Sequence, residues 1–125
     1  AVDRTVGGAY ENYVTPEMCV PEKPLRVPWE SCLTLGADFN YAYGDHYKSP
    51  RELVNLLVNI VAKGGNLALN ISPQPDGRIP VEAWESLRGL GVWMQMYGEA
   101  IYGTRICART GAETWHLREK VMLSM

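Results

Sequence analysis

Residues 63–73, which read Lys-Gly-Gly-Asn-Leu-Ala-Leu-Asn-Ile-Ser-Pro, constrain the fold of this chain more than any other stretch. The adjacent glycines Gly64 and Gly65 can adopt the positive φ that ends a helix and turns the chain sharply. Apolar residues then alternate with small or polar ones, which is the period of a strand: Leu67, Leu69 and Ile71 on one face, Asn66, Ala68 and Asn70 on the other. We predict the last strand of a parallel sheet, with a second face that suits a barrel interior or the wall of a site.

Helical patterns stand on both sides of this strand. Ser49 as N-cap, Pro50 at the first position and Glu52 three residues after the cap predict a helix start. Apolar residues follow at helical spacing, namely Leu53, Leu56, Leu57, Ile60 and Val61. A second helix is predicted from Pro80 to Tyr97, with Gly98 as its stop.

Extended structure is predicted upstream of both helices. Residues 29–34 and 39–43 are rich in Trp, Thr, Phe and Tyr, and residues 1–4 read as the tail of a strand. Strands alternating with helices predict βαβ units and a parallel sheet, an α/β fold. Residues 5–27 form a long loop with few periodic residues, and a long loop in a compact domain is either functional or disordered. Its apolar anchors favour a functional loop.

Composition excludes several function classes. The net charge is -2 and the basic residues are scattered, so the chain lacks the basic patch of a nucleic-acid binder. No apolar stretch approaches the 18 or so residues of a membrane span. Three cysteines without C-x-x-C spacing give neither a zinc site nor a redox pair. We therefore expect no metal, no cofactor, no nucleic acid and no membrane partner.

Three charged residues are candidates for a site. Arg4 would stand at the carboxyl end of a strand, although a solvated surface arginine is the alternative. Glu17 follows the stiff Pro16, and taken alone it would be read as a surface glutamate. Glu30, next to Trp29, is predicted to be partly buried, so it must find a partner or shift its pKa.

Several short motifs, taken together in order and spacing, resemble the α-L-fucosidases of glycoside hydrolase family 29. They are Asp3-Arg4, Thr15-Pro16-Glu17, Trp29-Glu30-Ser31-Cys32, Lys48-Ser49, residues 63–71, Asp76-Gly77 and residues 98–104. The resemblance covers residues 3 to about 107. It implies a (β/α)8 TIM barrel followed by a β-sandwich, and hydrolysis of terminal α-L-fucose through a covalent fucosyl-aspartate. Because such a barrel needs roughly 250 residues, the resemblance implies the C-terminal part of a barrel in residues 1–104.

The resemblance also assigns roles to individual residues. Glu17 matches the position of the general acid/base in the family. Arg4 matches an arginine that contacts the sugar, and Phe39 matches an aromatic residue that packs against the methyl group of the sugar. Glu30 stays a second candidate for the acid/base, because its apolar surroundings would raise its pKa as that role requires. No residue matches the nucleophilic aspartate, so we expect the chain alone to be inactive and to need the missing N-terminal part of the barrel. The implied substrate is a fucosylated glycan.

Residues 105–125 are expected to begin the following β-sandwich, but residues 109–125 lose the family likeness. Codons compatible with them encode, in another frame, Asn-Arg-Gly-Gly-Asn-Met-Ala-Phe-Thr-Gly-Lys-Gly-Asp-Ala-Val-Tyr, which looks like the strand-rich start of such a domain. Our hypothesis is a frameshift near Ala108, and a disordered tail is the other interpretation.

A different class of function also stays open, namely a stand-alone α/β module that binds sugar or a protein partner without catalysis.

Overall fold

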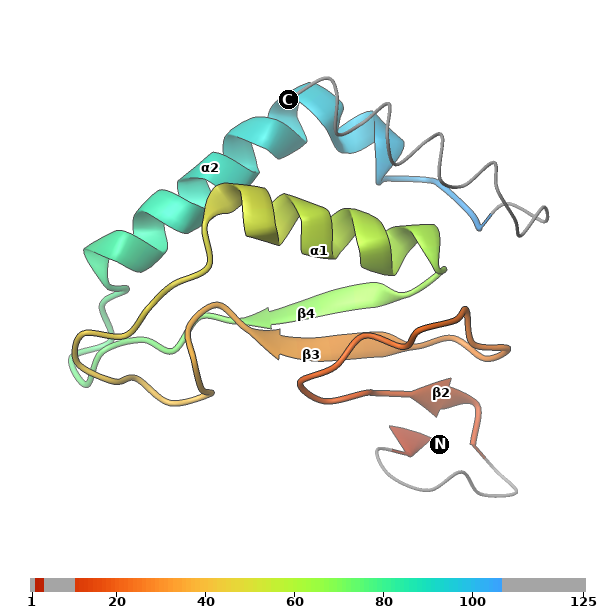
Figure 1. Ribbon diagram of the computed structural model, residues 1–125, viewed down its shortest axis with the longest axis horizontal. Coiled ribbons are helices and arrows are strands. Elements are labelled where there is room, and N and C mark those ends of the chain that lie inside the picture. The colour runs from red at the N-terminus through yellow and green to blue at the C-terminus, as the bar shows by residue number, and fades with distance from the viewer. Residues whose placement is uncertain (1, 4–10, 107–125) are drawn as a thin grey trace.

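The computed structural model describes residues 2–3 and 11–106. Four strands and two α-helices occur in these ranges, followed by one turn of 3₁₀ helix (Figure 1). In chain order they are β1 (Val2–Asp3), β2 (Tyr13–Val14), β3 (Glu30–Thr34), α1 (Pro50–Ala62), β4 (Asn66–Asn70), α2 (Val81–Tyr97) and η1 (Gly98–Ala100). The predicted strand tail near the N-terminus is confirmed for Val2–Asp3, whereas Arg4 and residues 107–125 lie outside the described residues.

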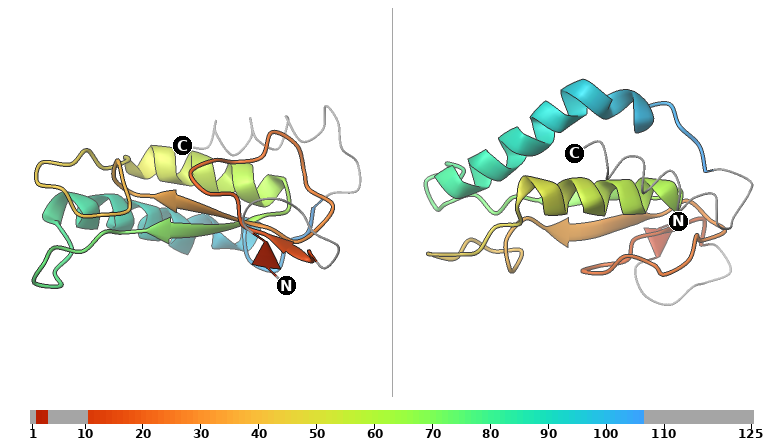
Figure 2. Two further views of the ribbon diagram at one scale, coloured as in Figure 1. Left: turned by 90° about the horizontal axis from the view of Figure 1, so that it is seen from below. Right: turned by 45° about the horizontal axis from the view of Figure 1, so that its top comes forward.

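All strand pairs in the described part are parallel, as the alternation of strands and helices predicts. β1 pairs with β2, and β3 pairs with β4 in a register that runs from Glu30 opposite Asn66 to Thr34 opposite Asn70. Two isolated bridges, one of which joins Glu17 to Cys32, connect the segment around β2 to β3. The described strands therefore follow one another across the sheet in chain order, with β3 and β4 side by side and pointing the same way (Figure 2).

Helix α1 begins where the sequence predicts. Ser49 and Glu52 form a reciprocal capping box, with the Ser49 N–H donating to the Glu52 carboxylate at 2.8 Å and Pro50 at the first helical position. Such a box satisfies two backbone donors that a helix end leaves unpaired. The helix starts close to the carboxyl ends of β3 and β4 and runs back along them (Figure 1).

Both helices cover one face of the β3–β4 pair, and two apolar clusters lie in between. The first contains Trp29, Leu33 and Ile60, with Leu56 and Leu67 packed against it. The second contains Leu35, Leu53 and Ala83, with Leu69, Ile71, Leu87 and Leu90 around it. Leu67, Leu69 and Ile71 therefore share the core face, as predicted. The opposite face carries Asn66, Ala68 and Asn70.

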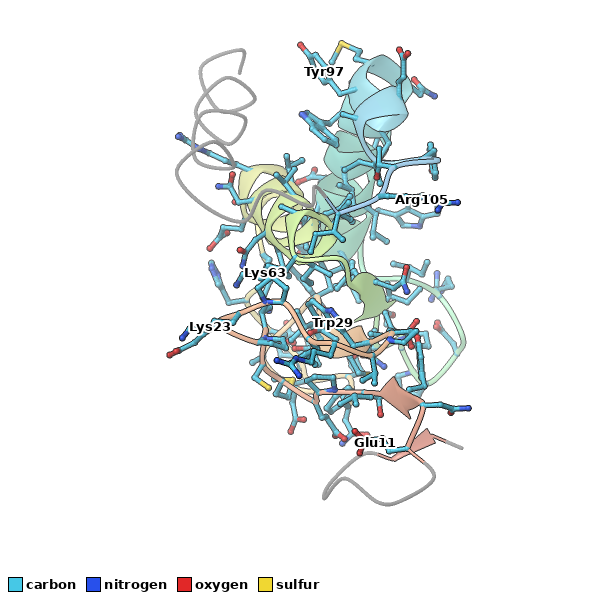
Figure 3. The ribbon with its side chains drawn as sticks, turned by 90° about the vertical axis from the view of Figure 1, so that its right-hand side faces the viewer. Glu11, Lys23, Trp29, Lys63, Tyr97 and Arg105 are labelled. Atoms are coloured by element: carbon cyan, nitrogen blue, oxygen red, sulfur yellow. The ribbon has the colours of Figure 1, made fainter. Side chains whose placement is uncertain are left out.

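The paired glycines before β4 serve two different purposes. Gly64 has a φ of +78° and turns the chain from α1 into β4. Gly65 is not in the left-handed region; a Cβ there would lie 2.5 Å from Cη2 of Trp29 and still closer to two other ring atoms. Trp29, 1% exposed, lies between the strands and the end of α1 near Lys63 (Figure 3). Gly65 is thus required because the indole ring occupies the space of a side chain.

Two predicted features differ in the structure. Residues 39–43 do not form a strand, because β3 and β4 already pair with each other and the chain bends away at residues 36–40. Gly98 has a φ of -58° and continues into η1 instead of adopting the left-handed stop. Its place is set by packing, since the Tyr102 ring lies 3.0 Å from where a Cβ would be. Neither described helix is long and apolar enough to cross a membrane.

Candidate active site at the carboxyl ends of the strands

Glu17 lies on a short extended segment that is hydrogen-bonded to β3. The Met18 N–H donates to the Cys32 carbonyl oxygen at 2.9 Å, and the Cys32 N–H donates to the Pro16 carbonyl oxygen, also at 2.9 Å. These two bonds hold the backbone on both sides of Glu17, while its side chain is exposed. A carboxyl group that is held on a fixed backbone and reached from solvent is a candidate for proton transfer to a bound molecule.

Met18 has a φ of +54°, which is unusual for a residue with a side chain. The segment after it is held by β3, because the Ser31 hydroxyl donates to the Cys19 carbonyl oxygen at 2.8 Å. The Thr34 hydroxyl lies 3.8 Å from the Met18 sulfur, but its proton goes to the Gly36 carbonyl oxygen at 2.7 Å. Such a conformation costs about 1–3 kcal/mol and persists only where the surroundings determine it, most often at functional sites. The chain therefore turns immediately after Glu17 at a strained, well-supported position.

The loop of residues 36–48 follows β3 and is fixed at its two ends. The Lys48 ammonium donates to the Thr34 carbonyl oxygen, the last of β3, at 2.6 Å. The Asp45 carboxylate accepts from the Ala37 N–H at 3.1 Å. A charged group thus closes each end of the loop that carries the predicted sugar-facing aromatic residue.

Ser72 joins this loop to the end of β4. It is buried, at 3% exposure, and has a φ of +43°. Its Oγ lies 2.8 Å from the Phe39 carbonyl oxygen and 2.6 Å from Asn70 Oδ1. The structure thus attaches Glu17 to Cys32, in the middle of β3, and Phe39 to Ser72, just beyond the carboxyl end of β4. The loops that follow β3 and β4 lie together at the carboxyl ends of these strands (Figure 1).

Glu30 occupies a different place in the sheet. It opens β3, in register with Asn66, so it lies farther from the carboxyl ends than Glu17, which bridges to Cys32. Tyr13 is one of its neighbours: loss of water around the Tyr13 hydroxyl, and then the Glu30 charge, raise the pKa of Tyr13. This environment is that of a half-buried carboxylate within a small polar cluster.

Sequence reasoning missed Met18, Ser72, Asp45 and Lys48 as supports of the site. A positive φ at a residue other than glycine leaves no local signal in a sequence. The hydrogen bonds of Ser72 and Lys48 join different segments, and that of Asp45 spans eight residues of an irregular loop. The sequence analysis includes Lys48 only as part of the Lys48-Ser49 motif and predicts no contact for it. Among the described residues, no group of three or more His, Cys, Asp or Glu side chains could hold a metal ion.

Parallel strands with strained, hydrogen-bonded loops and an exposed carboxylate near their carboxyl ends have the layout of an enzyme site in an α/β fold. Comparison with known proteins gives the family. A family model described as Alpha-L-fucosidase matches residues 1–99. The chain belongs to the α-L-fucosidases, which are glycoside hydrolases.

Individual relatives agree with this assignment. The plasma α-L-fucosidase of Rattus norvegicus is 42% identical over 98 residues, which are 74% of this chain and 21% of that protein. Among solved structures, an α-L-fucosidase of Paenibacillus thiaminolyticus matches with a TM-score of 0.76 at 34% identity, over 82% of this chain and 26% of that one. A Thermotoga maritima α-fucosidase in complex with fucose matches with a TM-score of 0.73 at 40% identity, over 86% and 24% of the two chains. The chain thus spans about a quarter or less of each relative.

Proposed function

We propose that this chain is part of a retaining exo-α-L-fucosidase that removes terminal α-L-fucose from glycans or glycoconjugates. The observation that carries the proposal is the placement of Glu17, exposed on a backbone held to β3 from both sides, within the region that matches the family. The relative solved with fucose supports a fucosylated substrate.

In the proposed mechanism Glu17 acts twice. First, the aspartate nucleophile supplied by another part of the enzyme attacks the anomeric carbon, the glycosidic C–O bond breaks, and the Glu17 carboxyl gives its proton to the leaving oxygen. Second, Glu17 takes a proton from water, whose oxygen attacks the anomeric carbon and releases the aspartate. Phe39 would pack against the methyl group of fucose, and Arg4 would contact the sugar hydroxyls. No aspartate of this chain matches the nucleophile, so the chain alone is expected to be inactive.

Glu17 is favoured over Glu30 for the acid/base role. Active sites of barrel enzymes lie at the carboxyl ends of the strands, and Glu17 is the nearer of the two to that edge. Glu30 is the first residue of β3 and lies beside Tyr13, whose pKa its charge helps to raise. We therefore assign Glu30 a structural role in the small polar cluster.

We further propose that residues 1–104 are the C-terminal part of a (β/α)8 barrel and that residues 105–125 enter a second domain. Within the described residues, β4 pairs only with β3 and β1 only with β2, so both outer strands present unpaired backbone groups. Such edges promote aggregation unless another strand covers them. The N-terminal part of the barrel is the partner that would cover them. The frameshift hypothesis is tested separately by reading the DNA across codon 108.

A second function, in a different class, has one observation in its favour. Tyr43 is 97% exposed at a turn of the loop that also carries Phe39. An exposed aromatic ring on a loop held at both ends can stack on a sugar without any catalysis. A stand-alone binding module would bind fucosylated glycans as the isolated 125-residue protein, whereas the enzyme part would need its remaining strands.

The experiment uses the gene with its upstream sequence restored and an aryl α-L-fucoside as substrate. We expect hydrolysis by the restored protein, and a loss of about 10²–10⁴-fold in Glu17→Gln, which can neither give nor take the proton. Glu22→Gln is the matched control, because Glu22 is exposed on the same loop. Equal activity of Glu17→Gln and the control would contradict the assignment. A comparable loss in Glu30→Gln but not in Glu17→Gln would move the role to Glu30.

A further inference from the structure

The position of Phe39 depends on its backbone more than on its side chain. The ring is only partly buried, so surrounding atoms do not enclose it. The charged contacts of the loop lie on either side, where Asp45 holds Ala37 and Lys48 holds the end of β3. A wall against a small apolar group must keep its place to within a fraction of an ångström, so the segment around Phe39 needs its own attachment.

Ser72 is that attachment. Its hydroxyl oxygen is within hydrogen-bond distance of three oxygen atoms: 2.6 Å from Asn70 Oδ1, 2.8 Å from the Phe39 carbonyl oxygen and 3.3 Å from the Asp38 carbonyl oxygen. A hydroxyl has one proton, so it donates to one acceptor at a time. If the Asn70 amide is turned so that its NH₂ donates to Ser72 Oγ, the Ser72 proton is left for Phe39, and both short contacts become hydrogen bonds.

The backbone of Ser72 indicates that this arrangement is specific. A serine at a φ of +43° is in a region that side chains disfavour, and glycine would occupy it without strain. A buried serine in such a conformation is expected where its hydroxyl makes contacts that glycine could not make. Here those contacts reach across more than thirty residues of sequence to the loop after β3.

We propose that Ser72 is a positioning residue that fixes Phe39 and thereby sets the selectivity of the site for a 6-deoxy sugar. The inference rests on the proposed function, in which Phe39 faces the methyl group of fucose. A firmly held ring leaves no room for the extra oxygen of a hydroxymethyl group, so α-L-galactosides, which differ from α-L-fucosides by that oxygen, are rejected. Without the Ser72 hydroxyl the loop relaxes and the discrimination falls.

The test compares kcat/KM for an aryl α-L-fucoside and the matching aryl α-L-galactoside in the restored enzyme. Ser72→Ala removes the hydroxyl and keeps the backbone strain, whereas Ser72→Gly removes both. Ser86→Ala is the control, because its buried hydroxyl donates to the Glu82 carbonyl oxygen within α2. We expect the fucoside-to-galactoside ratio to fall roughly 10-fold in both Ser72 variants, in the range that one small group in a pocket provides, and to stay constant in the control.

An unchanged fucoside-to-galactoside ratio would overturn the proposal. If both kcat/KM values fall by the same factor, the role of Ser72 is merely structural. If the restored enzyme has no activity on either substrate, the proposed function fails, and the attachment itself is then tested by amide hydrogen exchange in the same restored protein. Ser72→Ala should speed exchange at residues 37–40 relative to Ser86→Ala. Unchanged exchange there would refute the attachment independently of catalysis.

Discussion

Two glycines of α2 allow a matched test of how the helices pack. Gly89 faces α1, where an added Cβ would lie 2.6 Å from Cβ of Pro50 and closer still to its Cγ. Gly91, on the same helix, would meet no atom within 4 Å. Neither glycine has a positive φ, so both substitutions to alanine gain about 0.8–1.0 kcal/mol of helix propensity.

The difference between the two variants isolates the steric cost. Pro50 is a rigid ring held at the first turn of α1 by the capping box, so it cannot move aside as a flexible side chain would. The helices must separate instead, and overpacking of this kind costs about 1–3 kcal/mol. Gly91→Ala should be more stable than the parent by up to about 1 kcal/mol, and Gly89→Ala less stable than Gly91→Ala by about 1–3 kcal/mol.

The assay is thermal and urea unfolding of the parent and both variants under one set of conditions. In the restored protein, a difference of 1 kcal/mol shifts the Tm of a 150–250-residue domain by roughly 2–4 °C, so the two variants should melt at least about 2 °C apart. Equal urea m-values would show that unfolding exposes the same amount of surface in both variants. If Gly89→Ala is as stable as Gly91→Ala, then Pro50 does not pack on Gly89 and the reasoning is refuted.

Two further predictions concern the core and the start of α1. Gly65→Ala should destabilise the protein by about 1–3 kcal/mol, because the new methyl group overlaps the buried Trp29 ring; Gly77→Ala, at a positive φ with open space around it, should cost only about 1–2 kcal/mol of backbone strain, and a larger loss there than at Gly65 would contradict the packing. Ser49→Ala should cost about 1 kcal/mol at neutral pH by removing the N-cap. The Ser49 side chain, and then its backbone N–H, lower the pKa of Glu52, so this contribution is present above the unfolded pKa of about 4.3 and is lost as the pH falls through the lower folded value. The Tm difference between Ser49→Ala and the parent should therefore shrink in acid, and a constant difference from pH 7 to pH 3 would exclude a role for the Glu52 charge.

The sequence predicts the regular part of this fold well, because local signals and tertiary packing agree there. The capping box at Ser49 and Glu52, the helical spacing of α1 and the alternation in β4 each point to the structure that forms. Where they disagree, packing decides. The aromatic run of residues 39–43 has strand propensity but finds no free strand to pair with, and Gly98 is set by the neighbouring Tyr102 ring rather than by a helix stop.

The candidate site is predictable only as far as residue types carry it. Glu17 and Phe39 are candidates because they match the motifs of a family, and their roles stay predictions. Their supports were not found, since a hydrogen bond between Ser72 and Phe39, or between Met18 and Cys32, joins segments whose distance in sequence gives no pattern. Gly65 shows the same limit in the core. Glycine is needed there because of the ring of Trp29, a residue that lies just before β3 and far away in the sequence.

The two strained residues, Met18 and Ser72, connect these observations. They are the only residues other than glycine with a positive φ in the described part of the chain, and each lies next to a predicted site segment: Met18 follows Glu17, and Ser72 contacts the backbone of Phe39. Stability alone would favour glycine at both positions. At Ser72 the side chain makes a polar contact that glycine could not make, with Asn70 Oδ1 at 2.6 Å, and at Met18 the backbone N–H donates to the Cys32 carbonyl oxygen. Strain at these two positions therefore marks the segments of Glu17 and Phe39 as the part of the chain whose backbone is most closely determined by its surroundings, which is expected of the site that we propose.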